Sequence, residues 1–271
     1  MTDLIFTVEN NIARITLNRP DNLNAFSAEM IDSWIEALEV VRDSENIRAL
    51  ILSGNGRGFC SGGDIKAMTS GQGFFKSDGS EDLVSTALAR KNSLWKRVQR
   101  IPLILQEIDI PVIAVIHGFA FGAGFDMTLA CDIRIAANTT KISESYVKAG
   151  IVPGDGAAWF LPRIVGVDKA LDLLWTGDVL TAKEAKELGL VTYVVEDDQL
   201  HEFVENYVQK LISGPREVMR FTKRAIYQGL NMDLRTSFDM ISSAMGIVTE
   251  LDDYQEGVRA IAEKRKPIFG K

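Results

Sequence analysis

Two glycine-rich segments each follow an apolar run and lead into helix-compatible sequence. The first is Gly58–Ile65 (GFCSGGDI), after the run 47–52, and the second is His117–Asp126 (HGFAFGAGFD), after the run 111–116. Glycine and alanine leave backbone N–H groups accessible, and a following helix adds its positive end. Two such turns can therefore hold one developing oxyanion from two sides, which is a catalytic device made of main chain.

Taken alone, each segment is better explained as a tight turn that needs positive φ or close packing. A dinucleotide-binding turn fits less well, because Gly122-Ala123-Gly124 is followed by Met127 where that motif has its third glycine. No clear ribose-binding acid follows a second strand. The chemistry therefore depends on what the rest of the chain places beside these turns.

The composition is that of an ordinary globular protein and limits the partners. The 271 residues are 46% hydrophobic and 25% charged, with no run long enough to span a bilayer and no signal-like start, so we expect a cytoplasmic protein without a membrane partner. A net charge of -7 argues against a nucleic-acid partner. Cys60 and Cys131 show no metal-ligand spacing, so we expect reduced packing residues and no metal site.

The patterning predicts strands that alternate with helices, and hence an α/β fold with a largely parallel sheet. Residues 4–9 and 12–18 alternate around Asn10-Asn11 as an opening hairpin, and Ser27 suits the cap of the next helix. A longer helical segment over 94–105 is expected to kink at Pro102.

Two further segments shape the expected organisation of the chain. Residues 74–80, which are glycine-rich and polar, suit a mobile or disordered insertion. After a last strand at 191–195 the pattern is helical, which divides the chain into a core, residues 1–195, and a helical region, residues 196–271. An apolar stripe on that region needs a covering surface, from its own core or from another subunit. It comprises Leu234, Phe238, Ile241, Met245 and Val248.

The order of short motifs along nearly the whole chain resembles the enoyl-CoA hydratase/isomerase (crotonase) superfamily. The motifs are Asn18-Arg19-Pro20, Leu23-Asn24-Ala25-Phe26, both glycine segments, Ala130-Cys131-Asp132 and the terminal EKRKPIFG. The resemblance implies a crotonase-like spiral of ββα units with a C-terminal helical trimerisation region. It also implies an acyl-CoA thioester substrate and a homotrimer or dimer of trimers.

The same resemblance assigns roles in the two turns. The amides of Gly63 and Ala123 would bind the thioester oxygen, with Gly122 beside the acyl group. Asp126 stands where hydratases of the superfamily have a catalytic Glu and dienoyl-CoA isomerases can have an Asp. From the residues alone, Asp126 also suits a first-turn helix position that favours acidic groups. We favour catalysis for Asp126.

Four later residues bear on which reaction is catalysed. The second hydratase Glu is replaced by Tyr146, which can donate a hydrogen bond but is no carboxylate base, and this weighs against simple hydration. Glu144, two residues earlier, is expected at the surface. Gly154 stands where isomerases often have an acid, and Asp155 next to it is expected to cap the following helix, with an acid–base role as the alternative.

By resemblance, the path of coenzyme A is bordered by Leu23, Ala25, Ser61, Asp64 and Ile65, with Lys66 as a phosphate contact. Coenzyme A is part of the substrate, so no separate cofactor is expected. The nominal prediction is enoyl-CoA hydration through an oxyanion-stabilised enolate. The alternatives are double-bond isomerisation and, from another class, a non-catalytic acyl-CoA-binding scaffold.

Overall fold

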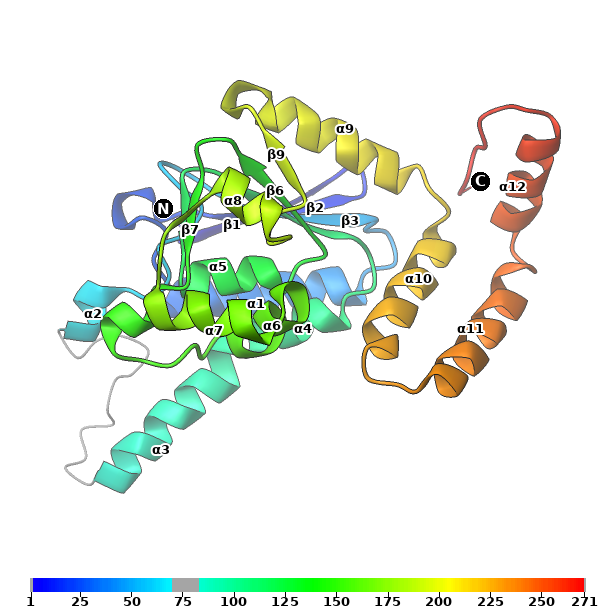
Figure 1. The fold of residues 1–271 in the computed structure, drawn as a ribbon. Helices are drawn as coiled ribbons and strands as arrows, with labels where there is room; N and C mark the ends of the chain where they lie inside the picture. Colours follow the sequence, from blue (N-terminus) through cyan, green and yellow to red (C-terminus); the bar gives the residue numbers. More distant parts are fainter. Residues whose placement is uncertain (1, 70–82, 271) are drawn as a thin grey trace.

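The computed structural model describes residues 2–69 and 83–270, and its centre is a six-stranded sheet in the order β1-β2-β3-β4-β6-β9 (Figure 1). Every neighbouring pair is parallel except β1 and β2, which confirms the largely parallel sheet. The strands are β1 Leu4–Glu9, β2 Ile12–Leu17, β3 Ala49–Gly54, β4 Val112–Ile116, β6 Ile133–Ala137 and β9 Tyr193–Val195.

The opening hairpin and the first helix form as the sequence predicts. Asn10 and Asn11 take positive φ angles of 51° and 63°, which two-residue hairpin turns of the favoured hand require. In helix α1, Ala28–Asp43, the Ser27 hydroxyl accepts a hydrogen bond from the Met30 amide at 3.0 Å. The apolar face of α1 then packs beneath the sheet in the main core.

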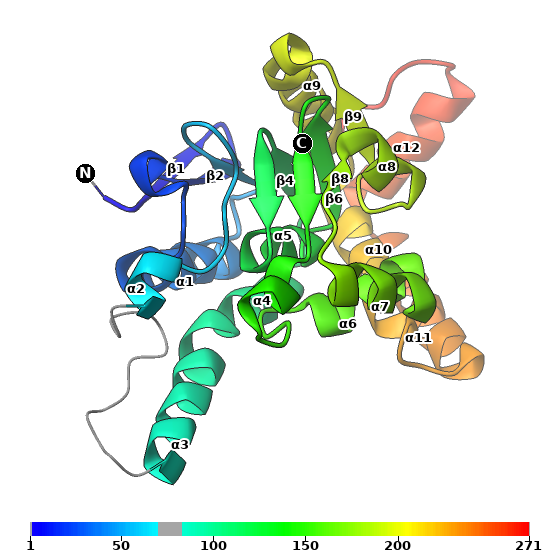
Figure 2. The same ribbon diagram turned by 60° about the vertical axis from the view of Figure 1, so that its left-hand side comes forward.

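Helices cover both faces of the sheet. Inward residues such as Ile15, Leu50 and Leu52 pack on one face. Figure 2 shows α5 below the strands, with α4 and α6 lower still. The alternate residues, such as Ile51 and Ile113, pack against α9 on the other face. The elements that follow the sheet strands are α2 Ile65–Thr69, α4 Arg100–Glu107, α5 Ala123–Leu129, α6 Ala157–Val165, α7 Val167–Thr176, α8 Ala182–Glu187 and α9 Leu200–Ile212.

The helical segment around residue 100 bends at a different place from the one predicted. Between α3, Leu83–Ser93, and α4 lies a wide turn, η2, Leu94–Val98, in which the Gln99 amide bonds the carbonyl five residues back at 3.0 Å. Pro102 is only the third residue of α4, where its missing N–H costs little. The irregularity therefore precedes the proline. The predicted insertion at 74–80 lies outside the described residues.

A second, three-stranded sheet in the order β5-β7-β8 completes the spiral. It comprises β5 Phe119–Phe121, β7 Lys141–Ser143 and β8 Leu180–Thr181. Three short 3₁₀ turns lie between the larger elements, η1 Pro20–Asn22, η3 Ser145–Ala149 and η4 Asp197–Gln199. The turns from β4 to β5 and from β7 to η3 bring the chain back repeatedly to the same edge of the core.

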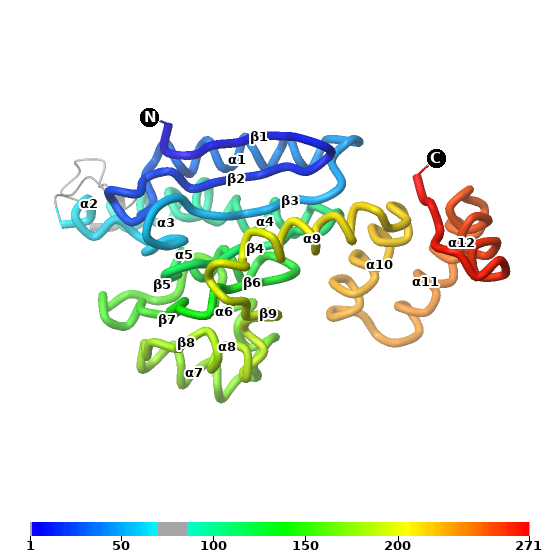
Figure 3. Tube along the Cα trace, turned by 90° about the horizontal axis from the view of Figure 1, so that it is seen from above, coloured from blue at the N-terminus to red at the C-terminus, as the bar shows by residue number. Residues whose placement is uncertain are grey.

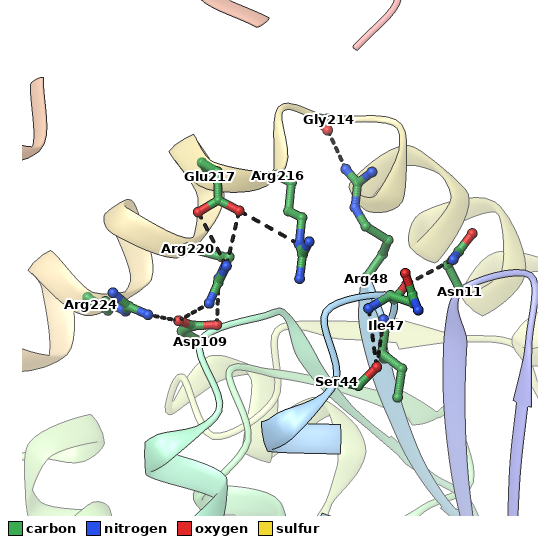
Figure 4. Close-up of polar contacts among 11 residues, drawn as sticks. Asn11, Ser44, Ile47, Arg48, Asp109, Gly214, Arg216, Glu217, Arg220 and Arg224 are labelled. Atoms are coloured by element: carbon green, nitrogen blue, oxygen red, sulfur yellow. Dashed lines mark hydrogen bonds and ion pairs between the residues drawn. The ribbon is translucent and has the colours of Figure 1, made fainter. Parts of the chain in front are cut away.

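The C-terminal helices extend from one side of the core in Figures 1 and 3. They are α10 Arg216–Gly229, α11 Leu234–Val248 and α12 Asp252–Ala262. Figure 4 shows how α10 is attached: Arg220 and Arg224 both reach the carboxylate of Asp109, and Arg48 donates to the Gly214 carbonyl at 2.7 Å. Helix α10 therefore docks through polar contacts.

Large apolar side chains of α11 remain exposed on this chain. Leu234 is 69% exposed and Phe238 is 63% exposed, and both belong to the predicted apolar stripe. An exposed stripe of this kind marks an interaction surface. Among the described residues, no helix is both long and apolar enough to cross a membrane.

Candidate active site

The two glycine-rich segments lie side by side and run parallel where Cys60 pairs with Ala120. The Phe59 amide donates to the Phe119 carbonyl at 2.9 Å, and the Phe121 amide donates back to the Cys60 carbonyl at 3.0 Å. The side chain of Asn24, which is fully buried, fixes the first segment by donating to the carbonyls of Gly58 and Phe59 at 3.0 Å each. Two turns that are about 60 residues apart in sequence thus meet at one place.

Glycine is required where the segments touch. Gly62 and Gly122 have φ angles of +87° and +47°, a region that other residues adopt only with strain. A Cβ on Gly62 would lie 2.7 Å from the Phe121 carbonyl oxygen and 3.2 Å from the Ala123 nitrogen. The first turn therefore packs directly against the amide that begins α5.

The amides of Gly63 and Ala123 are both available to a ligand. Each residue lines the same cavity, and within the described part of the chain neither N–H donates a hydrogen bond to a protein acceptor. Ala123 is also the first residue of α5, so the helix dipole adds positive potential at its amide. This arrangement suits an oxygen atom that gains negative charge during a reaction.

Gly124→Ala tests how tightly the two segments pack. The new Cβ would lie 2.7 Å from both the Cβ and the carbonyl oxygen of Cys60, so one segment must move. We expect a loss of about 1–3 kcal/mol in the free energy of unfolding. Gly246→Ala on α11 is the matched control, because nothing lies within 4 Å of its Cβ position and alanine favours a helix. Denaturant unfolding of both variants measures the difference, and equal stabilities would contradict the close packing.

The cavity beside these amides has a volume of about 690 Å³. Its wall is mainly apolar, and Tyr146 and Asp155 are among its polar lining groups. The lining residues are Phe26, Ser61, Gly63, Ile65, Met68, Leu94, Val98, Gly122, Ala123, Ser145, Tyr146, Lys148, Ala149, Ile151, Val152, Gly154 and Asp155.

Tyr146 bridges two buried carboxyl groups. Its hydroxyl oxygen lies 2.8 Å from Oδ2 of Asp126 and 2.9 Å from Oδ2 of Asp155. Asp126 comes from α5, Tyr146 from η3 and Asp155 from the loop before α6, so three separate elements build the contact. Tyr146 and Asp155 line the cavity, whereas Asp126 lies behind Tyr146 and is fully buried.

Burial and mutual repulsion control the ionisation of these acids. Burial, together with the nearby charge of Asp155, raises the pKa of Asp126 to about 7. Burial raises the pKa of Asp155 to about 6, although the Tyr146 hydroxyl opposes that shift. A carboxyl group with a pKa near neutrality can both accept and return a proton under physiological conditions.

The helix-capping role expected for Asp155 is wrong. Gly156 precedes the first residue of α6, and no side chain caps the helix from that position. The amide of Ala157 instead donates at 2.8 Å to Oδ2 of Asp126. Asp126 therefore binds the start of a different helix from its own, and Asp155 is left facing the cavity. Sequence spacing cannot reveal this exchange, because Asp126 and Ala157 lie 31 residues apart.

The surface position expected for Glu144 is also wrong. Glu144 is 3% exposed, and burial together with Asp126 raises the pKa of its carboxyl well above the usual range. It directly follows β7 and precedes η3, and this change of backbone direction turns its side chain inward. The cluster thus contains a third acid that the sequence did not indicate.

Asp126→Asn tests the ionisation of this cluster through stability. Because the folded-state pKa of Asp126 is about 7 and the unfolded value is near 4, the folded protein binds more protons between these values. The contribution of this group to the free energy of unfolding is therefore fully present below about pH 4. It is lost as the pH rises through about 7, by up to about 4 kcal/mol. Asp126→Asn should flatten this slope in urea unfolding at about pH 5 and about pH 8. An unchanged slope would contradict the raised pKa.

The residues predicted along the coenzyme A path divide into two groups. Ser61 and Ile65 line the cavity near Gly63. Asp64 has a structural role: it accepts from the Ala67 amide at 3.0 Å and pairs with Arg19 at 3.3 Å.

The other predicted coenzyme A residues contribute main chain or lie at the surface. Leu23 accepts from the Ser61 amide through its carbonyl at 3.0 Å, and Ala25 accepts from Arg19 through its own. Lys66 is exposed on α2. Sequence reasoning missed the apolar wall of the cavity, because its residues look like ordinary core positions. They are Phe26, Met68, Leu94, Val98, Ile151 and Val152.

A spiral of strand–strand–helix units, with two facing amide turns beside a buried acid, is the architecture of the crotonase superfamily. The sequence pattern of the family described as enoyl-CoA hydratase/isomerase matches residues 7–271. The chain belongs to the enoyl-CoA hydratase/isomerase family.

Similar proteins carry different activities in their names. The 1,2-epoxyphenylacetyl-CoA isomerase of Escherichia coli is 33% identical over 269 residues, which is 99% of this chain and 98% of the relative. The crotonyl-CoA hydratase of Syntrophomonas wolfei is 31% identical over 268 residues, 98% of this chain and 97% of the relative. The crystal structure of an enoyl-CoA hydratase from Bacillus anthracis has a TM-score of 0.84 at 31% identity and covers 98% of both chains.

Proposed function

We propose that this protein is an enoyl-CoA isomerase that shifts a double bond between the 3- and 2-positions of an acyl-CoA, with Asp155 as the acid–base group. One observation carries the proposal: within the described part of the chain, Asp155 is the one carboxylate that lines the cavity. A 1,3-proton shift needs a single group, because the proton taken from C2 can be returned at C4 on the same face. Asp126, favoured from the sequence, is separated from the cavity by Tyr146.

The proposed reaction begins when the Asp155 carboxylate takes a proton from C2 of a 3-enoyl thioester. The electrons move onto the thioester oxygen, which accepts hydrogen bonds from the amides of Gly63 and Ala123. Protonated Asp155 then gives the proton to C4, and the double bond forms between C2 and C3. Stabilisation of the dienolate oxygen lowers the barrier of both steps, because the charge is largest on that oxygen in the transition states.

The substrate class follows from the lining of the cavity and the family. Apolar side chains of Phe26, Met68, Leu94 and Val98 favour a hydrocarbon acyl group. Lys148 supplies a cation at the cavity wall. The coenzyme A moiety belongs to the substrate, and the proposed proton transfers require no further cofactor.

Hydration of a 2-enoyl-CoA is the second candidate function. The observation that favours it is the pair formed by Tyr146 and Asp155 at the cavity surface, since a hydroxyl and a carboxylate can together orient a water molecule. Against it, Tyr146 stands in place of the second carboxylate that the family resemblance implies for a hydratase.

Separate incubation with a 3-enoyl-CoA and a 2-enoyl-CoA tests the choice. We expect the 3-enoyl-CoA to be converted to the 2-enoyl-CoA, and little 3-hydroxyacyl-CoA to form from either substrate. Rapid formation of 3-hydroxyacyl-CoA from the 2-enoyl-CoA would favour hydration instead. Tight binding of both esters without turnover, across a series of chain lengths, would support the non-catalytic scaffold.

We also propose that the α11 stripe is covered by further copies of this chain, in a homotrimer or a dimer of trimers. The exposure of Leu234 and Phe238, and the family resemblance, support this assembly. Light scattering should give a mass three or six times that of one chain. Phe238→Glu should lower that mass, whereas Glu250→Gln in the exposed turn after α11 should not. A monomeric wild-type protein would contradict the assembly.

A further inference from the structure

Within the described part of the chain, three carboxyl oxygens of the acidic cluster have no hydrogen-bond partner. They are Oδ1 of Asp126 and both Oε atoms of Glu144, and all three are buried. Leaving a buried polar atom unsatisfied costs about 1–3 kcal/mol, and more if the atom is charged. Native structures contain few such atoms, so a group of three that belongs to two adjacent acids needs a common explanation.

Among the described residues, the groups that face the cluster include no compensating cation. The groups that face it are Asp126 from α5, Glu144 and Tyr146 at and before η3, Asp155 and the Ala157 amide before α6, and the Cys60 thiol from the first glycine segment. Within residues 2–69 and 83–270, no Lys or Arg forms an ion pair with any of the three acids. Two adjacent buried carboxylates without a cation repel each other strongly, so the pair must retain a proton.

We propose that Glu144 remains protonated and donates a hydrogen bond to Oδ1 of Asp126, so that Glu144, Asp126, Tyr146 and Asp155 form one hydrogen-bond chain that ends in the cavity. A single proton on Glu144 supplies a donor to Oδ1 of Asp126 and removes the charge from Glu144. It therefore gives a partner to Oδ1 of Asp126 and to one of the two Oε atoms of Glu144. Glu144 itself does not line the cavity and acts through Asp126, so it is a positioning residue.

The single hydrogen of the Tyr146 hydroxyl links this hydrogen-bond chain to Asp155 at the cavity. The tyrosine hydroxyl has one hydrogen, yet its oxygen lies at hydrogen-bond distance from a carboxyl oxygen on each side. It can donate to one side and accept from the other only if one of Asp126 and Asp155 is protonated. Asp126, Tyr146 and Asp155 together therefore carry one negative charge in this geometry.

The hydrogen-bond chain formed by Glu144, Asp126, Tyr146 and Asp155 has two arrangements of equal charge. In the first, Glu144 donates to Asp126, protonated Asp126 donates to Tyr146, and Tyr146 donates to an ionised Asp155, which can act as a base. In the second, Asp155 is protonated and donates to Tyr146, and the charge lies on Asp126, which accepts from Tyr146, from Glu144 and from the Ala157 amide. The proton moves from Asp126 to Asp155 through the hydroxyl, and no proton enters or leaves.

Raised pKa values agree with this arrangement. The values for Asp155 and Asp126, about 6 and about 7, lie close enough for a proton to be shared near neutrality. Burial and the charge of Asp126 also raise the pKa of the Glu144 carboxyl well above its ordinary range, which is the direction that retains its proton.

The consequence for catalysis rests on the proposed role of Asp155. A donor from Glu144 stabilises the ionised form of Asp126, which favours the arrangement in which Asp155 is protonated. Removing that donor should keep Asp126 protonated and let Asp155 ionise at lower pH. Glu144 thus sets the pH range in which the base is available.

Glu144→Gln and Glu144→Met form the matched pair for the test. Glutamine is neutral and keeps a donor toward Asp126, so the pH dependence of kcat should stay at its wild-type position. Methionine has a similar volume but no donor. In this variant the rise of kcat at low pH should therefore occur about one pH unit lower. Equal shifts in both variants would mean that Glu144 is ionised, and no shift in either would mean that it only packs. Either result overturns the proposal.

A measurement without substrate separates this inference from the choice of reaction. At a pH above the values for Asp126 and Asp155, wild-type protein should show the infrared C=O stretch of one buried protonated carboxyl group. Glu144→Gln should abolish this band, and the exposed control Glu36→Gln should retain it. Absence of the band from the wild type, or its survival in Glu144→Gln, would refute the proton on Glu144 even if the enzyme is an isomerase. A band that is present in the wild type and absent from Glu144→Gln would support the inference even if the protein turned over no enoyl-CoA.

Discussion

Asp155→Asn is expected to lower kcat by roughly 10²–10⁴-fold while binding of the coenzyme A ester changes little. The substitution keeps the size of the side chain and a hydrogen bond to Tyr146, but it removes the proton acceptor at the cavity wall. In the wild type, kcat should rise with pH through about 6, because burial raises the pKa of Asp155 to about 6 and only the ionised form is a base. Steady-state kinetics over a pH series, with ester affinity measured by calorimetry, checks both statements.

Asp126→Asn is the matched comparison. Asp126 makes no cavity contact, so its loss should act through Tyr146 and should reduce kcat less than the loss of Asp155. If Asp155→Asn retained the wild-type rate and Asp126→Asn lost it, the acid–base role would belong to Asp126, as favoured from the sequence. A wild-type oligomer mass and circular dichroism spectrum for both variants would show that the differences in kcat do not come from misfolding or altered assembly.

Ala123→Pro is expected to lower kcat by about 10²–10³-fold, the usual cost of one lost oxyanion donor. Proline has no N–H, and the first position of a helix tolerates proline well because that N–H has no partner within the helix. Ala123 is the first residue of α5, so the substitution removes the amide with little demand on the fold. Kinetics and thermal unfolding of the same variant separate the two effects.

Ala123→Gly retains the amide and serves as the control. It should keep kcat within about tenfold of the wild type, with a small loss of stability from glycine in a helix. A folded Ala123→Pro variant with wild-type turnover would remove the Ala123 amide from the mechanism. Equal losses in the proline and glycine variants would instead point to the alanine methyl group as the important feature.

The sequence by itself determined the elements of the core and the positions of the two amide turns. These features follow from local patterns: alternating apolar residues give strands, Ser27 caps α1, and paired glycines permit positive φ. The bend near residue 100 was misplaced, because a wide helical turn at 94–98 has no signal comparable to Pro102. Local chemistry therefore predicts elements better than it predicts irregularities within them.

Only the tertiary structure decided which acid faces the cavity. Asp126 and Asp155 are both short acids near a helix start, and the sequence assigned the cap to Asp155 and the chemistry to Asp126. The fold joins the Ala157 amide to Asp126 and places Tyr146 between the two acids. The burial of Glu144 arises in the same way. The direction and ionisation of a carboxyl group depend on neighbours distant in sequence, whereas the turns depend on the residues that form them.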